Sequence, residues 1–238
     1  MGKNNYFQFK QFTVRQEKAA MKVGTDGVLL GAWADVEKCD KILDVGTGTG
    51  LIALMLAQRS TAQITAIEIE ENAAAEAKSN VADSDWSNRI DVQNASFQEF
   101  AKNSVLKYDL IVSNPPFFSN NLKASNAPRN LARHNDSLSF LELITNALNL
   151  FDTNGRLAVI LPVEPAEEFN KLACKNGLYL LRRTEVSPSV AKAVNRVLME
   201  FTKKKTACKA ACLPVYSKDG SDYSVEFKTL TKDFYLRF

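Results

Sequence analysis

Short apolar runs alternate with stretches of helical periodicity along most of this chain. The runs are rich in Ile, Leu and Val, as expected of strands that are buried on both faces of a sheet. They lie at residues 42–45, 63–69, 90–92, 108–113, 156–162, 178–186 and 196–202. The helical stretches between them predict an α/β fold in which a mostly parallel sheet carries helices on both faces.

The first apolar run leads into three alternate glycines, Gly46, Gly48 and Gly50. Glycine is favoured where the backbone turns sharply or a ligand approaches it closely. The helical stretch that follows would direct free N–H groups and a partial positive charge at such a ligand. The nicotinamide fingerprint G-x-G-x-x-G is not satisfied, because Leu51 stands where its third glycine belongs. The pattern, which begins at Asp44, therefore predicts another ligand; a generic glycine turn is the alternative.

An acidic residue at the end of the second run supports the ligand interpretation. Glu68 lies 18 residues after Gly50, near the interval of roughly 20 residues at which an acid on a strand tip binds a ribose hydroxyl pair. Glu70 and Glu71 are better suited to favour the N-terminus of the next helix. Taken alone, Glu68 is better explained as a solvated acid at a strand end, and the glycine loop reverses that judgement.

The residues directly after the fourth run can carry chemistry; they are Asn114, Pro115, Pro116 and Phe117. Ligands of doubly wound sheets bind outside the carboxyl ends of the strands, so we expect this tetrapeptide to face the glycine loop across one crevice. The Asn114 amide oxygen and the Pro115 carbonyl are rigid acceptors, because proline restricts the backbone. Phe117 offers a flat face to a planar ring. Two acceptors on a conjugated exocyclic amine stabilise the positive charge that it develops as a nucleophile.

Further positions could reach the same ligands. Asp26 fits the N-cap of an apolar helical stretch at 28–33, and its carboxylate could instead bind a ligand ammonium group. Ser96 and Phe97 follow the third run, where an adenine ring lies in folds of this kind. Ser96 could hydrogen-bond the ring and Phe97 could pack on it; a plain turn is the alternative.

Length and composition restrict the class of protein. The 238 residues, 45% hydrophobic and 24% charged, suffice for one domain, which we expect to span 1–238 with a hairpin and helix extension at 1–35 and a catalytic core at 36–238. No apolar run approaches the roughly 20 residues of a membrane span, and the first 12 residues lack a signal-peptide core. We therefore expect a cytoplasmic protein. Four scattered cysteines and one histidine, His134, argue against a metal site.

Basic residues are concentrated in two segments, although the net charge is only +3. Residues 181–209 carry eight basic and two acidic residues, and residues 1–22 carry five basic and one acidic residue. Such segregation suggests a polyanionic partner, whereas a charge run is more often a solvated face. The candidate phosphate contacts are Arg129, Arg133, Lys203, Lys204 and Lys205.

The motifs also resemble those of a known family. The loop at 44–50 resembles the cofactor loop of class I S-adenosylmethionine-dependent methyltransferases, and 114–117 resembles the motif of enzymes that methylate amino groups. The stretch MKVGTDGVLLGAW at 21–33, together with 132–134 and 233–236, is similar to the bacterial tRNA(Val) (adenine-N6)-methyltransferases. The similarity spans essentially the whole chain, and the stretch at 21–33 is its most specific part.

This resemblance implies a Rossmann-like, seven-stranded sheet with an antiparallel last strand, S-adenosylmethionine as cofactor and tRNA as partner. It implies that residues 114–117 hold the adenosine 3′ of the anticodon. We expect a monomer without metal. Many relatives carry an acid where Ala95 or Ser96 stands, which is a departure at the adenine contact. The implied cofactor contacts are Asp44, Gly46, Gly48, Gly50 and Glu68, with Thr25 and Asp26 at the methionine end.

Other functions remain open at this point. DNA adenine methyltransferases usually need a target-recognition domain, and release-factor glutamine methyltransferases carry a helical N-terminal domain; this chain has room for neither. The ribosomal RNA guanine-N2 methyltransferases are the enzymatic alternative. A non-catalytic, S-adenosylmethionine-binding RNA-binding protein is the other, and the intact tetrapeptide at 114–117 argues against it.

Overall fold

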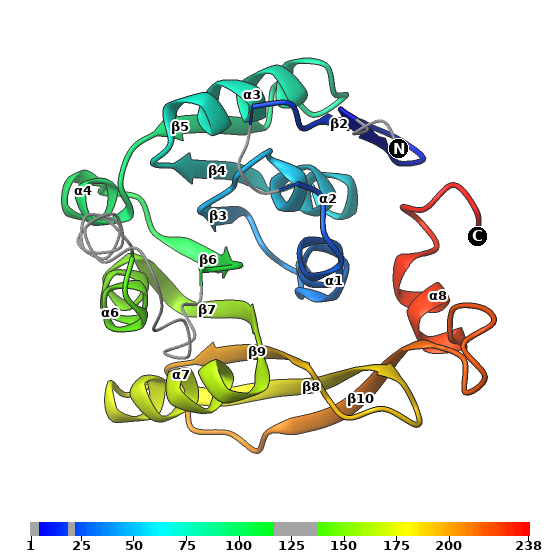
Figure 1. The fold of residues 1–238 in the computed structure, drawn as a ribbon. Coiled ribbons are helices and arrows are strands. Elements are labelled where there is room, and N and C mark those ends of the chain that lie inside the picture. Colours follow the sequence, from blue (N-terminus) through cyan, green and yellow to red (C-terminus); the bar gives the residue numbers. More distant parts are fainter. Residues whose placement is uncertain (1–4, 19–21, 117–137) are drawn as a thin grey trace, which may run out of the picture.

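A twisted eight-stranded sheet forms the centre of the molecule in a computed structural model that describes residues 5–18, 22–116 and 138–238 (Figure 1). The strand order is β10-β8-β9-β7-β6-β3-β4-β5. The strands are β3 (Lys41–Val45), β4 (Gln63–Glu68), β5 (Ile90–Asn94), β6 (Tyr108–Ser113), β7 (Phe151–Leu161), β8 (Tyr179–Ser189), β9 (Arg196–Thr202) and β10 (Lys209–Tyr216).

The predicted fold class is confirmed, with one correction to the sheet. The seventh strand, β9, pairs antiparallel with both β7 and β8, as expected. The chain then adds an eighth strand, β10, which pairs parallel with β8 at the edge of the sheet and is the last strand. The sequence pattern missed β10 because its first four residues are exposed and it contains Pro214, which a strand tolerates at a sheet edge.

Helices cover both faces of this sheet because its strands place alternate side chains on opposite faces. Ile42 packs with one apolar cluster and Leu43 with the other. The first cluster contains residues of α1 (Thr25–Trp33), α2 (Leu51–Arg59), α3 (Glu71–Ala82) and α8 (Val225–Thr231). The second contains residues of α4 (Phe97–Asn103), α6 (Phe140–Leu150) and α7 (Val163–Lys175).

Several helix ends follow the local sequence signals. Ser139 and Glu142 form a capping box at the start of α6, as the sequence predicts. Gly177 follows α7 with φ +83°, the left-handed conformation that suits glycine. Among the described residues, no helix is long and apolar enough to cross a membrane.

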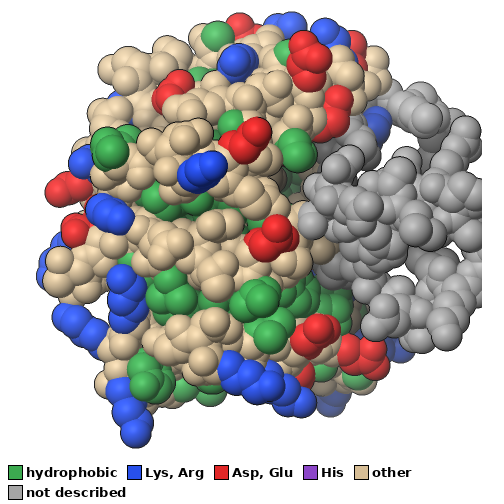
Figure 2. Space-filling view, turned by 90° about the vertical axis from the view of Figure 1, so that its left-hand side faces the viewer, with side chains coloured by type: hydrophobic (Ala, Val, Ile, Leu, Met, Phe, Trp, Pro, Cys, Tyr) green, Lys and Arg blue, Asp and Glu red, His purple; other side chains and the backbone are tan. Residues whose placement is uncertain are grey.

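Figure 2 shows the side of the molecule that carries α4, α6 and α7, where apolar side chains reach the surface between charged ones. Leu141 at the start of α6 is 48% exposed, and Val105, which follows α4, is 90% exposed. The candidate site is found at the carboxyl ends of the parallel strands.

The two ends of the described chain pack together. The hairpin of β1 (Tyr6–Gln8) and β2 (Thr13–Arg15) buries Phe9 and Phe12. The backbone N–H of Lys10 donates to the Phe234 carbonyl at 2.8 Å, and the rings of Phe9 and Tyr235 lie 5.9 Å apart. Both termini therefore lie on the same side of the molecule (Figure 1).

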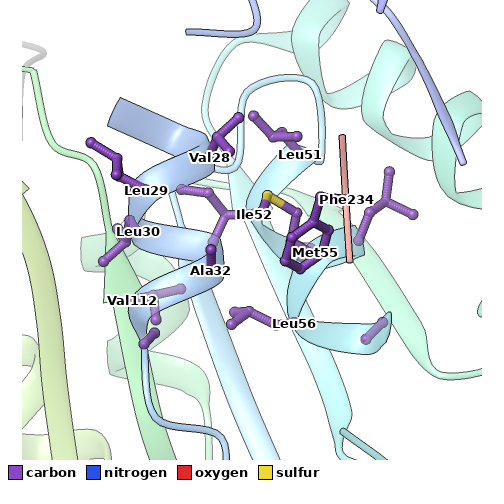
Figure 3. Close-up of a cluster of buried hydrophobic side chains, with 14 of the residues drawn as sticks. Val28, Leu29, Leu30, Ala32, Leu51, Ile52, Met55, Leu56, Val112 and Phe234 are labelled. Atoms are coloured by element: carbon purple, nitrogen blue, oxygen red, sulfur yellow. The ribbon is translucent and has the colours of Figure 1, made fainter. Parts of the chain in front are cut away.

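Two glycines let α1 approach α2 closely. A Cβ at Gly31 would lie 2.8 Å from Met55 Sδ, and one at Gly27 would lie 3.0 Å from Leu51 Cδ2. Figure 3 shows the side chains of the two helices meeting at this contact. The guanidinium of Arg59 at the end of α2 donates at 2.8 Å to the carbonyls of Gly31 and Ala34, so the C-terminus of α1 is capped from its neighbour.

Gly31→Ala is expected to lower the free energy of unfolding by about 1 kcal/mol, because overpacking costs about 1–3 kcal/mol and exceeds the helix-propensity gain of about 1 kcal/mol. Urea titration measures the change. In a Met55→Ala background the contacts with Met55 Sδ and Cε are removed and only the contact with Cβ, at 3.0 Å, remains, so Gly31→Ala should cost clearly less than in the wild type. Equal effects in both backgrounds would contradict the packing explanation.

Candidate active site

The pairing of β3 with β6 brings the glycine loop and the Asn-Pro-Pro segment together. Val45 and Ser113, the last residues of these strands, are register partners, and the Ser113 hydroxyl donates to the Val45 carbonyl at 2.9 Å. Gly46 and Asn114 are the next residues along each strand. The predicted proximity of the two motifs is therefore confirmed. They meet at the carboxyl ends of the parallel strands, which we call the carboxyl edge of the sheet.

The loop after β3 has a backbone that requires glycine. Gly46, Gly48 and Gly50 have φ values of +71°, +57° and +83°, a region that other residues rarely adopt. Cβ atoms added at Gly46 and Gly48 would meet nothing within 4 Å. The loop therefore offers an open, backbone-lined surface to a ligand. The N–H groups of Gly46 and Thr47 both donate to the Ile67 carbonyl, at 2.9 and 3.0 Å, which holds the loop against β4.

Asp44 lies fully buried beneath this loop. Its Oδ2 accepts hydrogen bonds from the Thr47 hydroxyl at 2.6 Å and from the Ala53 N–H at 3.1 Å. Among the described residues, its Oδ1 has no hydrogen-bond partner. Burial raises the pKa of the Asp44 carboxyl to about 7. Asp44 thus organises the loop and keeps one buried acceptor that a ligand group or a proton can satisfy.

Glu68 extends from the end of β4 to the glycine loop. Its Oε2 accepts from the Gly48 N–H at 2.9 Å, and its Oε1 accepts from the Glu70 N–H at 3.0 Å. Glu70 instead caps α3 by accepting from the N–H groups of Asn72 and Ala73, as expected for an acid at a helix N-terminus. A carboxylate at the tip of the second sheet strand therefore lies in contact with the loop.

Ile69 is a candidate ligand contact that the sequence analysis missed. Its side chain is 58% exposed although it directly follows a buried strand. The Asn94 amide of β5 donates to the carbonyls of Glu68 and Ile69 at 2.9 and 3.0 Å, which holds this strand end in place. An apolar side chain next to the acid that the sequence predicts to bind a ribose was the signal available.

Ser96 and Phe97 have structural roles here. Ser96 is the N-cap of α4, and its hydroxyl accepts from the Glu99 N–H at 3.2 Å. Phe97 is only 4% exposed and packs in the core cluster with Leu43 and Ile67. A contact of either residue with a cofactor adenine stays a prediction.

The prediction that Asp26 caps α1 is wrong. The N-cap is Gly24 and the helix begins at Thr25, which places Asp26 within the first turn. Its Oδ2 accepts from Arg196 Nε at 2.8 Å instead. Because β9 is antiparallel to β7, Arg196 starts β9 at the carboxyl edge, so this ion pair brings Thr25 and Asp26 to the same edge as the glycine loop.

The Asn-Pro-Pro segment is described up to its third residue. Asn114 is half-buried, Pro115 is buried and Pro116 is exposed. Phe117, Arg129 and Arg133 lie outside the described residues, as does His134.

The structure does not bring Lys203, Lys204 and Lys205 to this site. They follow Thr202, which pairs with Arg156 at the opposite end of β7 from Leu161, an interval of about 17 Å along the strand. Lys204 Nζ donates to Asn154 Oδ1 at 2.6 Å. The sequence analysis grouped residues 181–209 as one basic segment. Because β9 runs antiparallel to β7, the basic residues at the two ends of β9 lie at opposite edges of the sheet.

Three arginines of that segment are engaged in ion pairs. Arg182 pairs with Glu200, which is fully buried between Arg182 and Arg156. Arg183 pairs with Glu167 at 2.8 Å, and Arg196 pairs with Asp26. Their guanidinium groups therefore support the fold. No cluster of potential metal ligands occurs within the described part of the chain.

Comparisons with known proteins agree with this fold. The family model of the methyltransferase small domain matches residues 23–166. A predicted O-methyltransferase from Agrobacterium tumefaciens has a similar structure, with a TM-score of 0.67, 21% identity and coverage of 88% of this chain and 96% of that one. The ribosomal RNA guanine-N2 methyltransferase of T. thermophilus, solved with AdoMet and guanosine, has a TM-score of 0.55 at 15% identity, covering 84% of this chain and 50% of that one. The chain therefore belongs to the methyltransferases of the small-domain family.

Full-length relatives define the family more narrowly. A protein of Trichodesmium erythraeum is 49% identical over 98% of this chain and 99% of its own length. A protein of Parabacteroides distasonis is 47% identical over 98% and 99%, and one of Histophilus somni is 41% identical over 100% of both chains. All three are named tRNA1(Val) (adenine(37)-N6)-methyltransferase. This chain belongs to that family.

The raised pKa of Asp44 predicts how stability depends on pH in the ligand-free protein. Between pH 3.8, its ordinary pKa, and about 7 the folded chain keeps a proton at Asp44 that the unfolded chain has released. The free energy of unfolding therefore falls as the pH rises through this interval and levels off above it. Asp44→Asn removes this titration, so from pH 5 to pH 8 the variant should gain on the order of 3 kcal/mol relative to wild type. Urea titration at each pH measures the free energy of unfolding. An equal change with pH in both proteins would contradict the assignment of this titration to Asp44.

Proposed function

We propose that this protein transfers a methyl group from S-adenosylmethionine to the exocyclic N6 of the adenosine 3′ of the anticodon in tRNA(Val). The observation that carries the proposal is the juxtaposition of the glycine loop and Asn114 through the Val45–Ser113 pair. The full-length similarity to enzymes named for this reaction supports the choice of substrate. Those relatives are bacterial proteins, and bacterial tRNA is made in the cytoplasm, where we expect the enzyme to act.

The residues at the carboxyl edge fit the proposed cofactor. The open glycine backbone, the unpartnered Oδ1 of Asp44 and the Glu68 carboxylate provide the surface and acceptors that a nucleoside requires. Glu68 would exchange its bond to Gly48 for the ribose hydroxyls, and Ile69 would cover one face of the adenine ring. When bound, S-adenosylmethionine supplies an electrophilic sulfonium methyl group. The remaining residues proposed to hold it are Asp44, Gly46, Gly48, Gly50, Thr25 and Asp26.

Asn114 and Pro115 are proposed to activate the target amine. The adenine N6 lone pair is delocalised into the ring, which makes it a poor nucleophile. The Asn114 amide oxygen and the Pro115 carbonyl would accept hydrogen bonds from the two N–H groups of this amine. They would favour the pyramidal form of N6 and stabilise the positive charge that develops on it during transfer. Both residues follow a strand end that Ser113 ties to β3, so the acceptors are held in place before the reaction. In-line placement of amine and methyl contributes most of the remaining acceleration.

The target base must leave its stack, which costs a few kcal/mol and least in a loop. Stacking of the base on Phe117 would offset this cost by about 1–3 kcal/mol. No general base is required, because the N6 proton becomes acidic only after methyl transfer begins. His134 therefore needs no role in the proposed reaction.

The direct test is methyl transfer from labelled S-adenosylmethionine to unmodified tRNA, ribosomal RNA, DNA and release factor, followed by digestion and mass identification of the product. N6-methyladenosine in tRNA(Val) alone is the expected result. N2-methylguanosine in ribosomal RNA would overturn the proposed substrate. Cofactor binding without transfer to any of these substrates would favour a non-catalytic RNA-binding protein.

Asn114→Ala is expected to retain cofactor affinity and to lose at least about 100-fold in single-turnover rate, as removal of a preorganised acceptor does in other enzymes. Calorimetry measures the affinity, and rapid quench measures the rate. Lost cofactor affinity would contradict the division of labour between the tetrapeptide and the glycine loop.

The positions of the basic residues predict different roles in tRNA binding. Lys192 lies between β8 and β9 at the carboxyl edge and is exposed. Lys192→Ala should lower the log–log salt slope of binding to an isolated anticodon arm by about 0.7–0.9. Changing Lys203, Lys204 and Lys205 together to alanine should affect full-length tRNA only, because these residues would meet a part remote from the target base. A larger effect of the triple variant on the isolated arm would contradict this arrangement.

A further inference from the structure

We propose that Glu76 and Asn80 of α3 are positioning residues for cofactor binding. They fasten the N-terminal strap, which the structure describes at residues 15–18 and 22–23, to the glycine loop. The inference rests on the proposed use of S-adenosylmethionine at that loop, and it assigns a role to two buried polar residues that the catalytic scheme does not use.

Asn80 bridges the strap and the loop with its whole amide group. Its side chain is 1% exposed. Its Oδ1 accepts from the Arg15 N–H at 2.9 Å, and its Nδ2 donates to the Arg15 carbonyl and to the Thr49 carbonyl, both at 2.9 Å. Thr49 lies between two of the three loop glycines. One side chain therefore ties the end of the N-terminal hairpin to the cofactor loop.

Glu76 holds the next part of the strap one helical turn earlier. It is 6% exposed, and its Oε1 accepts from the N–H groups of Glu17 at 2.6 Å and Lys18 at 3.0 Å. The strap is also tied across itself, because Gln16 Oε1 accepts from the Val23 N–H at 2.8 Å. A buried carboxylate is costly unless its hydrogen bonds are made, and here two backbone donors supply them.

The same face of α3 supports the glycine loop directly. A Cβ at Gly50 would lie 3.5 Å from the Ala77 Cβ, so the loop rests on α3 between Glu76 and Asn80. Residues 76, 77 and 80 share one helix face. This face thus sets the position of the loop and of the strap that leads into α1, whose first turn carries Thr25 and Asp26. Both halves of the proposed cofactor site therefore depend on α3.

Glu76 and Asn80 use different hydrogen-bonding groups, so the proposal predicts different effects for their conservative variants. Glu76 Oε1 accepts from two backbone N–H groups, and Glu76→Gln retains one oxygen that can accept at this position. Asn80 needs one acceptor and two donors. Asn80→Asp keeps the shape and the acceptor, loses both donors and places a carboxylate against the carbonyls of Arg15 and Thr49.

The experiment measures S-adenosylmethionine affinity by calorimetry and single-turnover rates at saturating cofactor, using full-length variants. Asn80→Ala and Asn80→Asp should each weaken cofactor affinity about tenfold, the effect of losing one or two net hydrogen bonds, while the saturated rate stays within about twofold because residues 114–117 are untouched. Glu76→Ala should weaken affinity similarly, and Glu76→Gln, which keeps an acceptor oxygen for the N–H groups of Glu17 and Lys18, should weaken it less.

Asn176→Ala is the matched control, because its amide donates to the Leu172 carbonyl at 2.8 Å at the end of α7, away from the site. It should lower the melting temperature without changing cofactor affinity. Unchanged affinity in Asn80→Ala, or an equal loss in Asn176→Ala, would overturn the proposal. If the Asn80 variants do not fold, the contrast between Glu76→Ala and Glu76→Gln decides it. Methylation of another nucleic acid would refute the proposed substrate and leave this test intact, whereas wild-type protein that does not bind the cofactor would refute both.

Discussion

The parallel pairing of β3 with β6 is the constraint on which the site depends. These strands are separated in the sequence by two strand-helix units, yet their last residues, Val45 and Ser113, are register partners joined by a hydrogen bond. The residues that follow these strands, Gly46 and Asn114, therefore emerge side by side. A shift of one residue in this register would turn every side chain of β6 to the other face, and would move Asn114 away from Gly46. The apolar clusters on both faces of the sheet prevent that shift.

Buried polar side chains organise both this edge and the body of the sheet. Asp44 holds the glycine loop from below, Asn80 holds it from the side, and Glu200 binds two arginines where β7, β8 and β9 meet. Burial of such groups costs free energy unless they are hydrogen-bonded. In each case at least two partners are present; those of Asn80 and Glu200 come from segments distant in the sequence, whereas the partners of Asp44, which are Thr47 and Ala53, are close to it. These side chains therefore fix the relative positions of elements that apolar packing alone would hold less specifically.

The antiparallel strand β9 decides how the basic residues are distributed. Arg196 at its start lies at the carboxyl edge and neutralises Asp26, whereas Lys203 beyond its end lies at the opposite edge. Glu68, an acid of the same edge, ends β4 on the other side of β3. Glu68 of the proposed cofactor site and Lys192 of the proposed tRNA contacts thus lie on opposite sides of the Asn-Pro-Pro segment along this edge.

The sequence by itself determined the features that depend on neighbouring residues. Apolar periodicity identified seven strands, the capping box identified the start of α6, and the alternate glycines identified the sharp turn after β3, because each follows from local backbone preferences. Only the tertiary structure decided features that depend on distant partners. The edge strand β10 forms against β8, Asp26 pairs with Arg196 instead of capping its helix, and Asn80 bridges Arg15 to Thr49. Nothing in the local sequence around these residues specifies the partner, since that choice follows from the register and direction of strands far away in the chain.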